Sequence, residues 1–515
     1  MSEKPLHDAD PGIERSAQRG PSDGSLSSWP DLGLSGLADD VVDGIERIRA
    51  EASSAFESSI RLGVTGLSGA GKTVFITALI ANLLSRERLL QFPAGTNGRI
   101  RAAMIRPQPD DDVPRFAYEA HVAALRADPP AWPVSTRSVS QLRLSLALQP
   151  RGIIEGVSGL LGEVFGGGGN GPVLNIDIVD YPGEWLLDLP LMDLDYERWS
   201  ADALSVAESP VRRTVSAGFR DRLTTVDPGA RHDEAVAQDL AAAWTQHLRD
   251  AQAAGLSRLA PGRFLMPGDI AGSPMLVFAP LPRPERSSGR GRGTLFWEMR
   301  RRFDAYRRHV VRPFFRNHFA RLDRQVVLVD PLPALERGAG ALADQTDTLR
   351  AILSAFRHGR SGWLDRLLGG RRIDRILVAA TKADRLHHSQ HGAHAQLIEA
   401  MLADAVGKAA FGGASVEPLA LAAIRATTEG EGRGPGGPVP VVKGIDGEGR
   451  AIALHPGRLP EDPAAFLAKA AGARPETGAG DYQSLDFRPP DWGDGAPPHM
   501  RLDRALEFLI GDHLG

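Results

Sequence analysis

The sequence has no cysteine in its 515 residues. Disulfide bonds, a thiol nucleophile and a metal site built on thiolates are therefore excluded, and the composition fits a reducing compartment. Long apolar runs are also missing, because no stretch is long enough to span a bilayer. Residues 1–10 lack the basic and then apolar layout of a secretory signal. From these absences we expect a cytoplasmic protein.

Charge of one sign is not in excess either. A formal net charge of −4 and a hydrophobic content of 42% describe an ordinary globular protein, and they argue against bulk affinity for nucleic acid. The length provides enough apolar residues for two or three domains. Residues 1–36 are rich in Ser, Gly, Pro and Asp and poor in apolar residues, so we predict a disordered N-terminal segment.

One short segment carries strong chemical information. Residues 66–73 read Gly-Leu-Ser-Gly-Ala-Gly-Lys-Thr and lie between an apolar run typical of a strand and one typical of a helix. In such a phosphate-binding loop the glycines let backbone N–H groups point at phosphate oxygens, and the helix start adds positive potential. Lys72 reaches the β- and γ-phosphates, where its charge serves catalysis, and Thr73 offers a hydroxyl to Mg²⁺. The predicted nucleotide-binding residues of this segment are Gly66, Ser68, Gly69, Ala70, Gly71, Lys72, Thr73 and Val74.

Lysine is scarce, with six in the whole chain, whereas arginine is abundant. An arginine would carry the same charge without the compact ammonium that fits this loop. The alternative, a glycine-rich turn that matches the pattern by composition, is therefore disfavoured.

A second phosphate-related motif follows a predicted β-hairpin. Residues 141–148 alternate at the period of a strand, and residues 173–179 form a second strand after a long connection that ends in the glycine-rich loop 166–171. Asp180 follows directly and can hold Mg²⁺ through water, while the Gly183 N–H can contact the γ-phosphate. Alone, this spacing also fits a simple turn.

Later apolar runs predict the fold class. Residues 325–330, 373–380 and 416–424 indicate buried parallel strands separated by helices. We therefore predict an α/β fold of the P-loop NTPase, GTPase-like type. It should have a mixed, mostly parallel sheet flanked by helices, a large helical insertion and a small C-terminal accessory element.

The chain is expected to divide along these lines. A helix within residues 37–60 should lead into the first strand and pack on the nucleotide domain. The expected parts are the disordered segment 1–36, the first part of the nucleotide-binding domain at 37–183, a mainly helical insertion at 184–322, the second part of the nucleotide-binding domain at 323–429, and an accessory β/α element at 430–515.

The motifs in their order, each after a predicted strand, resemble those of the translation-factor class of P-loop GTPases. The segments are 66–73, 180–183, 381–384 and 423–425. More narrowly, the chain is similar to the YcjX-like family of bacterial P-loop GTPases from about Leu62 to its end. The residues that carry this resemblance are 64–77, 180–185 and 321–330.

The resemblance implies roles for the later motifs. Asp384 would accept hydrogen bonds from N1 and N2 of guanine while the stem of Lys382 packs over the ring, and adenine offers no such pair of donors. The usual first residue of this motif is asparagine, and Thr381 departs from it, so a polar turn without a nucleotide role stays open. Ala423 and Ile424 match the looser fifth motif, which contributes small size and a backbone N–H.

Two residues are expected to complete the catalytic machinery. Thr136 stands where such GTPases place the threonine that closes over the γ-phosphate and Mg²⁺, with Ser135 and Ser138 as alternatives. Glu184 follows the second phosphate motif and could accept a hydrogen bond from the attacking water. Its negative charge near the phosphate predicts slow hydrolysis, and capping of the next helix is an equal alternative. A stabilising arginine is expected from Arg137 or from a partner.

Two further segments have alternative interpretations. Residues 294–321 are basic and aromatic, which suits an amphipathic helix better than a docking surface for nucleic acid or an anionic membrane. His387 and His388 follow the base-reading motif and are expected to start a helix, because the sequence shows no partner at a spacing typical of a metal site.

Three functions remain open at this point. The first is a GTPase switch that binds GTP and GDP with Mg²⁺, hydrolyses GTP slowly and moves its insertion, which is well placed after the γ-phosphate sensor. The others are a P-loop ATPase and a nucleotide-gated scaffold with little turnover. The family resemblance implies a stress-associated cytoplasmic protein that works beside an inner-membrane partner. The sequence itself shows neither role and leaves the oligomeric state open.

Overall fold

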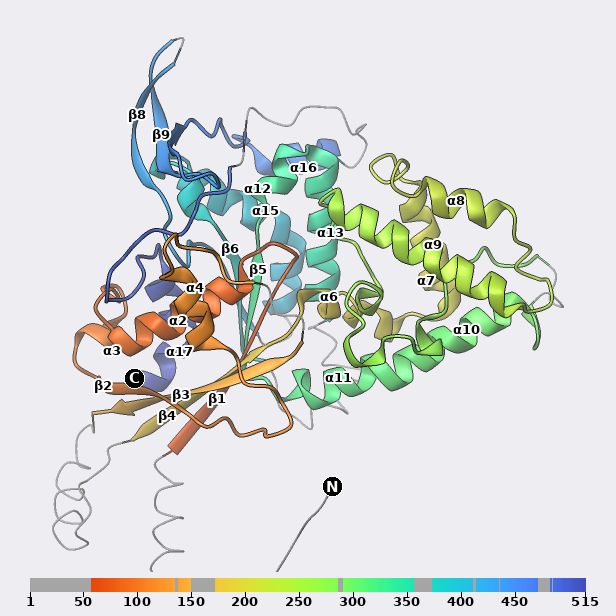
Figure 1. Cartoon of the computed structure of the whole chain (residues 1–515), viewed down its shortest axis with the longest axis horizontal. Helices are drawn as coiled ribbons and strands as arrows, with labels where there is room; N and C mark the ends of the chain where they lie inside the picture. The colour runs from red at the N-terminus through yellow and green to blue at the C-terminus, as the bar shows by residue number, and fades with distance from the viewer. Residues whose placement is uncertain are drawn as a thin grey trace, which may run out of the picture. The chain divides into compact units, whose positions relative to one another are not determined.

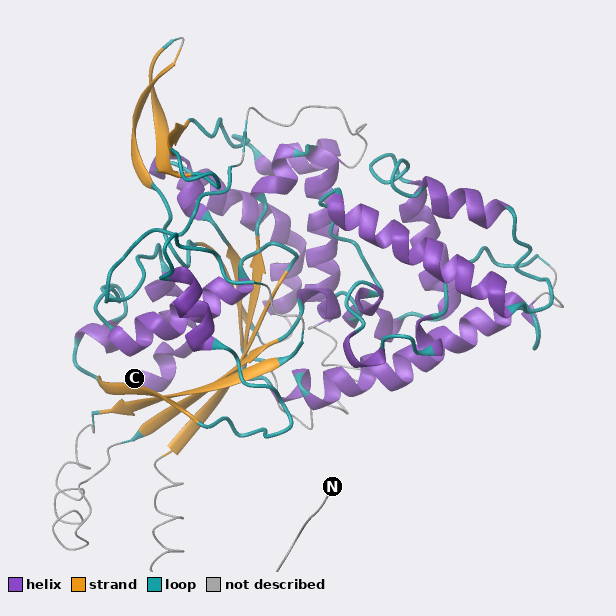
Figure 2. Ribbon diagram, viewed as in Figure 1, coloured by secondary structure: helices purple, strands orange, loops and turns teal. Residues whose placement is uncertain are grey.

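A seven-stranded mixed sheet carries the fold (Figures 1 and 2). The computed structural model describes residues 57–134, 138–149, 172–285, 290–355, 373–410, 414–434, 436–470, 482–483 and 485–515. The strands of the sheet are β1 (Glu57–Gly66), β2 (Ile100–Arg106), β3 (Ser140–Leu148), β4 (Val173–Asp180), β5 (Arg324–Val329), β6 (Arg375–Ala380) and β7 (Ser415–Ala420). Their order is β2-β3-β4-β1-β5-β6-β7.

Strand directions match the prediction. β4, β1, β5, β6 and β7 run parallel. β3 pairs antiparallel with β4, and β2 pairs antiparallel with β3, so β3 and β4 are the strands of the expected hairpin. In the parallel register Val64 lies opposite Asp180, and Gly66 lies opposite Leu328. Because β1 and β4 run in the same direction, the phosphate-binding loop and the Asp180 motif emerge at one edge of the sheet.

Each central strand contributes to two cores, one on each face of the sheet. In β5, Val326 and Leu328 belong to one core, while Val327 and Val329 belong to the other. Successive side chains of a strand point to opposite faces, so a strand buried on both faces is apolar throughout. All six residues of β5 are buried, which explains the apolar run of residues 326–329 within it.

Helices cover both faces of this sheet (Figure 1). α2 (Lys72–Ser85) and α17 (Leu502–Leu514) pack into one core, and α13 (Ala339–Ala355) and α15 (His391–Ala410) pack into the other. The shorter helices are α3 (Pro93–Thr96), α4 (Tyr118–Leu125), α12 (Leu332–Glu336) and α16 (Pro463–Ala470). This arrangement confirms the α/β P-loop GTPase-like fold class.

Between β4 and β5 the described elements are all helical. They are α6 (Gly183–Leu186), η1 (Leu189–Asp193), α7 (Tyr196–Glu208), α8 (Ala217–Thr224), α9 (Glu234–Ala253), η2 (Gly262–Phe264), η3 (Gly268–Ile270), η4 (Pro274–Leu276), α10 (Leu295–Tyr306), a π-helical turn (Arg307–Val311), α11 (Arg312–Asn317) and η7 (Phe319–Arg321). Their shared core is aromatic, because Trp199 stacks on Phe303 at 4.9 Å and meets Trp244 and Phe278 edge-on. Such ring pairs add to the stabilisation from buried area.

The basic and aromatic segment behaves as an amphipathic helix. Phe296, Phe303 and Tyr306 are buried, and the guanidinium of Arg302 donates to Glu298 and pairs with Glu234. The expected amphipathic character is confirmed, and the π-helical turn at Arg307–Val311 interrupts the regular helix.

A second, antiparallel sheet of three strands lies near the end of the chain. It consists of β8 (Thr428–Gly434), β9 (Gly437–Ile445) and β10 (Ala451–Leu454). α17 does not share this sheet, because Leu502, Leu506 and Leu509 are buried in the same core as α2. The part predicted as 430–515 therefore contains one helix, α17, that packs on the seven-stranded sheet. The limits of the predicted domains remain predictions.

Three local predictions need correction or lie outside the described residues. Glu57–Ile60 belongs to β1 and not to a helix, because these residues pair with β4, and the rest of the 37–60 prediction lies outside the described residues. The strand predicted at 416–424 ends at Ala420, where the backbone turns into the base-reading region. The glycine-rich loop 166–171 also lies outside the described residues.

No helix in the described ranges combines the length and the apolar character that crossing a bilayer requires.

A buried ion pair ties the insertion to α13 and generates a stability prediction. Arg212 is 1% exposed, and its guanidinium donates to Asp344 at 2.6 Å. The other Asp344 oxygen accepts from the Ser257 N–H at 2.7 Å. Asp344→Ala should lower the free energy of unfolding by about 3–5 kcal/mol, since it leaves a buried charge unpaired.

The measurement is urea unfolding of the variant and of a matched control. Asp239→Ala removes an equally close partner from Arg222, but that pair is about half exposed, so the control should change stability little. Equal effects of the two substitutions would contradict the importance assigned to the buried pair.

Candidate functional site

The phosphate-binding loop lies between β1 and α2, as predicted. Gly69 and Gly71 have φ of 78° and 79°, a left-handed conformation that favours glycine. α2 begins at Lys72 with Gly71 as its N-cap, no side-chain capping bond and no acidic residue in its first turn. The positive end of α2 therefore points to the loop, where it would favour an anion.

Two predicted charged residues meet behind this loop. The Lys72 ammonium donates to the Asp180 carboxylate, which is 1% exposed, and Thr73 is buried in the next position. The structure thus brings together two of the three side chains predicted to serve the phosphates and Mg²⁺, and the third, Thr73, adjoins Lys72 in the chain. Carboxylate and hydroxyl oxygens are the ligands that Mg²⁺ prefers, so this donor set fits the ion.

Gly183 makes a close backbone approach to the loop. A Cβ added at Gly183 would overlap the carbonyl oxygen of Gly66. Only glycine can therefore bring the start of α6 against the start of the phosphate-binding loop. A cavity of about 120 Å³ opens there, lined by Gly66, Leu67, Ser68, Gly69, Ala70, Gly71, Lys72, Thr73, Val74, Pro133, Pro182, Gly183, Glu184 and Met266.

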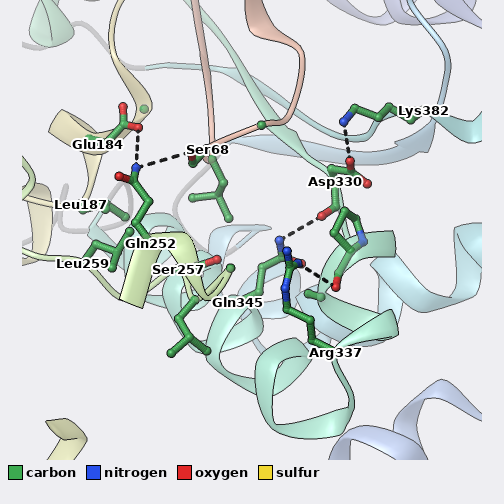
Figure 3. A pocket seen from close by; sticks show the side chains of 17 residues that line it. Ser68, Glu184, Leu187, Gln252, Ser257, Leu259, Asp330, Arg337, Gln345 and Lys382 are labelled. Atoms are coloured by element: carbon green, nitrogen blue, oxygen red, sulfur yellow. Dashed lines mark hydrogen bonds and ion pairs between the residues drawn. The ribbon is translucent and has the colours of Figure 1, made fainter. Parts of the chain in front are cut away.

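Glu184 lies inside α6 and faces the insertion (Figure 3). The helix takes Pro182 as its N-cap, so the alternative in which Glu184 caps this helix is wrong. Its Oε1 lies 3.4 Å from Nε2 of Gln252, and the same Nε2 lies 3.5 Å from the Ser68 hydroxyl. Gln252 was not predicted from the sequence, because it stands 68 residues further on.

The predicted base-reading motif directly follows β6. Lys382 has a left-handed backbone with φ of 58°, and its ammonium contacts Asp330 at 2.8 Å. The buried Asp384 carboxylate accepts from the Ala426 N–H at 2.8 Å, and burial raises the pKa of this carboxyl. The Thr381 hydroxyl donates to the Val329 carbonyl at 3.2 Å, which binds the motif to β5.

These segments enclose a second cavity of about 220 Å³. It is lined by Gly69, Ala70, Gly71, Val74, Trp132, Pro133, Thr381, Lys382, Asp384, Arg385, Ala422, Ala423, Ile424, Ala426, Asp486 and Phe487. The predicted base-reading and fifth motifs thus share one pocket with the phosphate-binding loop. The aromatic Trp132 and the C-terminal Asp486 and Phe487 were missed, because they lie in segments without periodicity or a motif.

Thr136 lies outside the described residues, together with Ser135 and Arg137. Its predicted roles stay predictions, and so does the source of a stabilising arginine. Ser138, the other alternative for this role, is described and exposed.

The first residues after Gly183 contact later parts of the helical insertion. The indole N–H of Trp185 donates to the Met266 carbonyl at 3.1 Å, and the Arg263 guanidinium lies 3.2 Å from the centre of the same ring. A Cβ at Gly262 would overlap the carbonyl oxygen of Glu184. The segment that follows the phosphate motif therefore has backbone and side-chain contacts to the helical insertion.

Asp188 extends this connection with a buried carboxylate. One oxygen accepts from the Gly262 N–H at 2.7 Å, and the other accepts from the Tyr306 hydroxyl. Burial raises the pKa of Asp188 to about 6, against the lowering effect of these hydrogen bonds. The carboxylate thus joins the segment between α6 and η1 to η2 and α10.

The histidines after the base-reading motif also acquire a partner. His387 begins a 3₁₀ turn as its N-cap, as expected of a polar helix start. Nδ1 of His388 contacts Oε2 of Glu429 at 2.5 Å, and Glu429 belongs to β8. Sequence spacing did not reveal this partner, because it is 41 residues away on another element.

Comparison with known proteins places these features in a family. The model of the YcjX-like family, DUF463, matches residues 60–514. A protein of Escherichia coli (strain K12) named Ras-like GTPase YcjX is 38% identical over 477 residues, which cover 91% of this chain and 98% of that protein. A protein of the same name from Shewanella oneidensis is 35% identical over 478 residues, which cover 88% of this chain and 94% of that protein. The similarity therefore extends through the insertion to α17.

The raised pKa of Asp188 predicts a pH-dependent stability. A carboxyl whose pKa rises from 3.8 to about 6 on folding favours the folded state when it is protonated. This contribution is complete below about pH 4 and is lost as the pH rises through about 6, and two units correspond to about 3 kcal/mol. Buried histidines with lowered pKa values, such as His394, add an opposite pH dependence that the wild type and Asp188→Asn share. In urea unfolding, the wild type should therefore lose about 3 kcal/mol relative to Asp188→Asn between pH 4 and pH 7.

The control for this comparison is Asp239→Asn, which changes an exposed carboxylate. Its stability should follow the wild-type pH dependence. If the Asp188→Asn curve also runs parallel to the wild type, the buried carboxylate does not titrate as described.

Proposed function

The chain belongs to the YcjX-like family, and on that premise we propose that it is a GTPase that binds GTP and GDP with Mg²⁺ and hydrolyses GTP slowly to GDP and phosphate. The observation that carries this proposal is the pocket in which the phosphate-binding loop meets the Lys382–Asp384 motif. Both relatives are named GTPases, in agreement with the expected nucleoside triphosphate hydrolase. The expected division into a nucleotide-binding domain at 37–183 and 323–429 and an insertion at 184–322 is part of the proposal.

Guanine selectivity is proposed to depend on Asp384. Its carboxylate is buried and fixed by the Ala426 N–H, at the floor of a pocket with Ala423 and Ile424. A carboxylate accepts from two neighbouring N–H donors, and guanine presents such a pair at N1 and N2. Desolvation strengthens this discrimination, because an unpaired charge in the pocket costs more than one in water.

The phosphate end of the pocket supplies the groups for hydrolysis. Lys72 and the first N–H groups of α2 would bind the β- and γ-phosphates, and Thr73 and Asp180 would supply oxygen ligands for Mg²⁺. When bound, the ion would neutralise charge that develops on the phosphate oxygens. Lys72 must then leave Asp180 for the phosphates, which are the stronger partner of an ammonium in this loop.

Slow turnover follows from the residue beside the γ-phosphate position. Glu184 can accept a hydrogen bond from water, but its charge repels the phosphate oxygens. Thr136 is proposed to close over the γ-phosphate and Mg²⁺. The proposed setting, a stress-associated cytoplasmic protein beside an inner-membrane partner, rests on the family resemblance alone.

Nucleotide state is proposed to reach the insertion through residues 183–188. The Gly183 N–H is the expected contact of the γ-phosphate, and Trp185 and Asp188 are bound to η2 and α10. A shift of Gly183 between GTP and GDP would therefore be passed to the helices.

One observation supports an ATPase as a second candidate. Thr381 stands where these GTPases have asparagine, and its hydroxyl is directed to the Val329 carbonyl. Base competition with fluorescent GDP and ADP, in the presence of Mg²⁺, separates the two candidates.

The Asp384→Asn variant provides the sharper test. An amide in place of the carboxylate loses the double acceptor for guanine and gains a donor for the C2 carbonyl of xanthine. We expect affinity for GDP to fall about 10- to 100-fold, since hydrogen bonds to charged groups contribute about 1.5–3 kcal/mol, while affinity for xanthosine diphosphate rises.

A variant that binds xanthosine diphosphate is folded, so a gain there separates base reading from damage to the fold. Unchanged affinity of the variant for GDP would contradict the role of Asp384 in guanine recognition. A wild-type protein that binds ADP more tightly than GDP would contradict it as well.

A further inference from the structure

A side chain of the insertion reaches both loops that face the phosphates (Figure 3). Gln252 stands in the last turn of α9, and its Nε2 lies 3.4 Å from Glu184 Oε1 and 3.5 Å from the Ser68 hydroxyl. Ser68 belongs to the phosphate-binding loop, and Glu184 follows the γ-phosphate contact. A cavity of about 220 Å³ separates this group from Asp330, Arg337 and Gln345.

The end of α9 is held in place by the nucleotide-binding part of the chain. Gly255 has φ of 75° and the Leu256 N–H donates to the Ala251 carbonyl at 2.9 Å, which ends the helix sharply. The next residue, Ser257, donates its N–H to Asp344 of α13 at 2.7 Å. Gln252 is therefore presented from a fixed helix end and not from a mobile loop.

The chemistry of the amide complements that of Glu184. A carboxylate only accepts hydrogen bonds, whereas a glutamine amide has two donors and an acceptor. A donor on one Glu184 oxygen reduces its repulsion of the phosphate and leaves the other oxygen for the attacking water. Glu184 alone would have neither an orienting partner nor a neutralising one from its own segment.

We propose that Gln252 is a positioning residue for GTP hydrolysis, supplied by the insertion to Glu184 and Ser68, so that hydrolysis requires α9 to be docked. This inference rests on the proposed GTPase function. In the reaction the water oxygen bonds to the γ-phosphorus, and the bond to the bridging oxygen breaks with its electron pair remaining on GDP. One water proton stays on the released phosphate and the other passes to solvent.

The test compares Gln252→Ala with Gln246→Ala in the full chain. Gln246 lies on the same helix, and its amide contacts the exposed Asp250, so it is a matched control. Single-turnover hydrolysis of GTP with Mg²⁺ should slow about 10-fold or more in Gln252→Ala, while affinity for fluorescent GDP stays within about twofold. Gln246→Ala should match the wild type in both measurements.

Two further variants distinguish positioning from a structural role. Gln252→Glu places a second carboxylate beside Glu184, which raises one pKa of the pair. Its hydrolysis should therefore be faster at pH 6 than at pH 8 relative to the wild type. In the double variant Glu184→Ala/Gln252→Ala the rate should fall no further than in Glu184→Ala, because the two residues act as a unit.

Hydrolysis by Gln252→Ala at the wild-type rate would overturn the inference. So would a double variant whose rate falls by the product of the two single effects. Either result would leave the GTPase proposal standing. A wild-type protein that binds no guanine nucleotide would instead overturn the proposed function and this inference with it. The two failures are therefore distinguishable.

A separate observation concerns the histidines beside the base-reading motif. His387, His388 and Glu429 form a group of three whose ligand atoms all lie within 4.8 Å of one another, within the part of the chain that the structure describes. His387 Nε2 lies 4.0 Å from Glu429 Oε2, and His388 Nδ1 lies 2.5 Å from the same oxygen. Ligands bonded at about 2.0 Å to a tetrahedral ion are about 3.3 Å apart, so small side-chain shifts suffice.

We infer that this group binds a divalent transition-metal ion such as Zn²⁺, with a fourth position open to water. Imidazole nitrogens bind transition-metal ions in preference to Mg²⁺ and Ca²⁺, which prefer oxygen ligands. The ion would fasten β8 to the base-reading turn, where the Thr427 hydroxyl donates to the Asp384 carbonyl. Metal binding is therefore expected to affect guanine affinity.

The test is calorimetric titration of chelator-treated protein with Zn²⁺ in excess Mg²⁺, which occupies oxygen sites. One equivalent should bind to the wild type and be lost in both His388→Ala and Glu429→Gln. His513→Ala removes another histidine beside a carboxylate, 4.0 Å from Asp512, and should retain that equivalent. Loss in the control, or retention in the two site variants, would contradict the site.

Discussion

Two backbone contacts that leave no room for a side chain organise the whole site. Gly183 lies against the Gly66 carbonyl, and Gly262 lies against the Glu184 carbonyl. The first contact joins the proposed γ-phosphate contact, Gly183, to the phosphate-binding loop, and the second joins the residue after it to η2. The first contact follows from the parallel register of β1 and β4, which sets Val64 beside Asp180 so that the two strands end close together. Close backbone packing of this kind transmits displacement, because a packed interior does not deform continuously.

Charged and polar side chains also connect the phosphate-binding loop to the helical insertion. The Lys72–Asp180 pair keeps two opposite charges together where phosphate and Mg²⁺ are proposed to bind. Asp188, a few residues further, carries a raised pKa because it is buried between η2 and α10. Gln252 approaches Glu184 from the insertion side. The nucleotide pocket and the helices thus share polar contacts as well as an apolar core, which is the arrangement that a switch requires.

Much of the fold was predictable, because its signals are local. The apolar run of β5, the alternation of β3 and the loop at 66–73 each reflect a backbone preference or a burial pattern within a few residues. The resemblance to GTPases located Lys382 and Asp384, which the structure brings into one pocket with the loop.

The long-range contacts on which the proposed coupling depends were not predictable in the same way. Gln252, Asp188, Trp132 and Asp486 carry no motif, and their roles come from partners far along the chain. Glu429 reaches His388 because β8 folds back over the base-reading turn. At the N-terminal side, helical periodicity was misleading at 57–60, since pairing with β4 overrides a weak local preference.

The central claim is that nucleotide state is coupled to the insertion through residues 183–188. Hydrogen–deuterium exchange of the full chain with Mg²⁺ and either GDP or a non-hydrolysable GTP analogue tests it most directly. The account predicts that protection differs between the two states in the phosphate-binding loop, in residues 183–188, in η2 and in the last turn of α9. A difference confined to the phosphate-binding loop, with η2 and α9 exchanging equally in both states, would contradict the account.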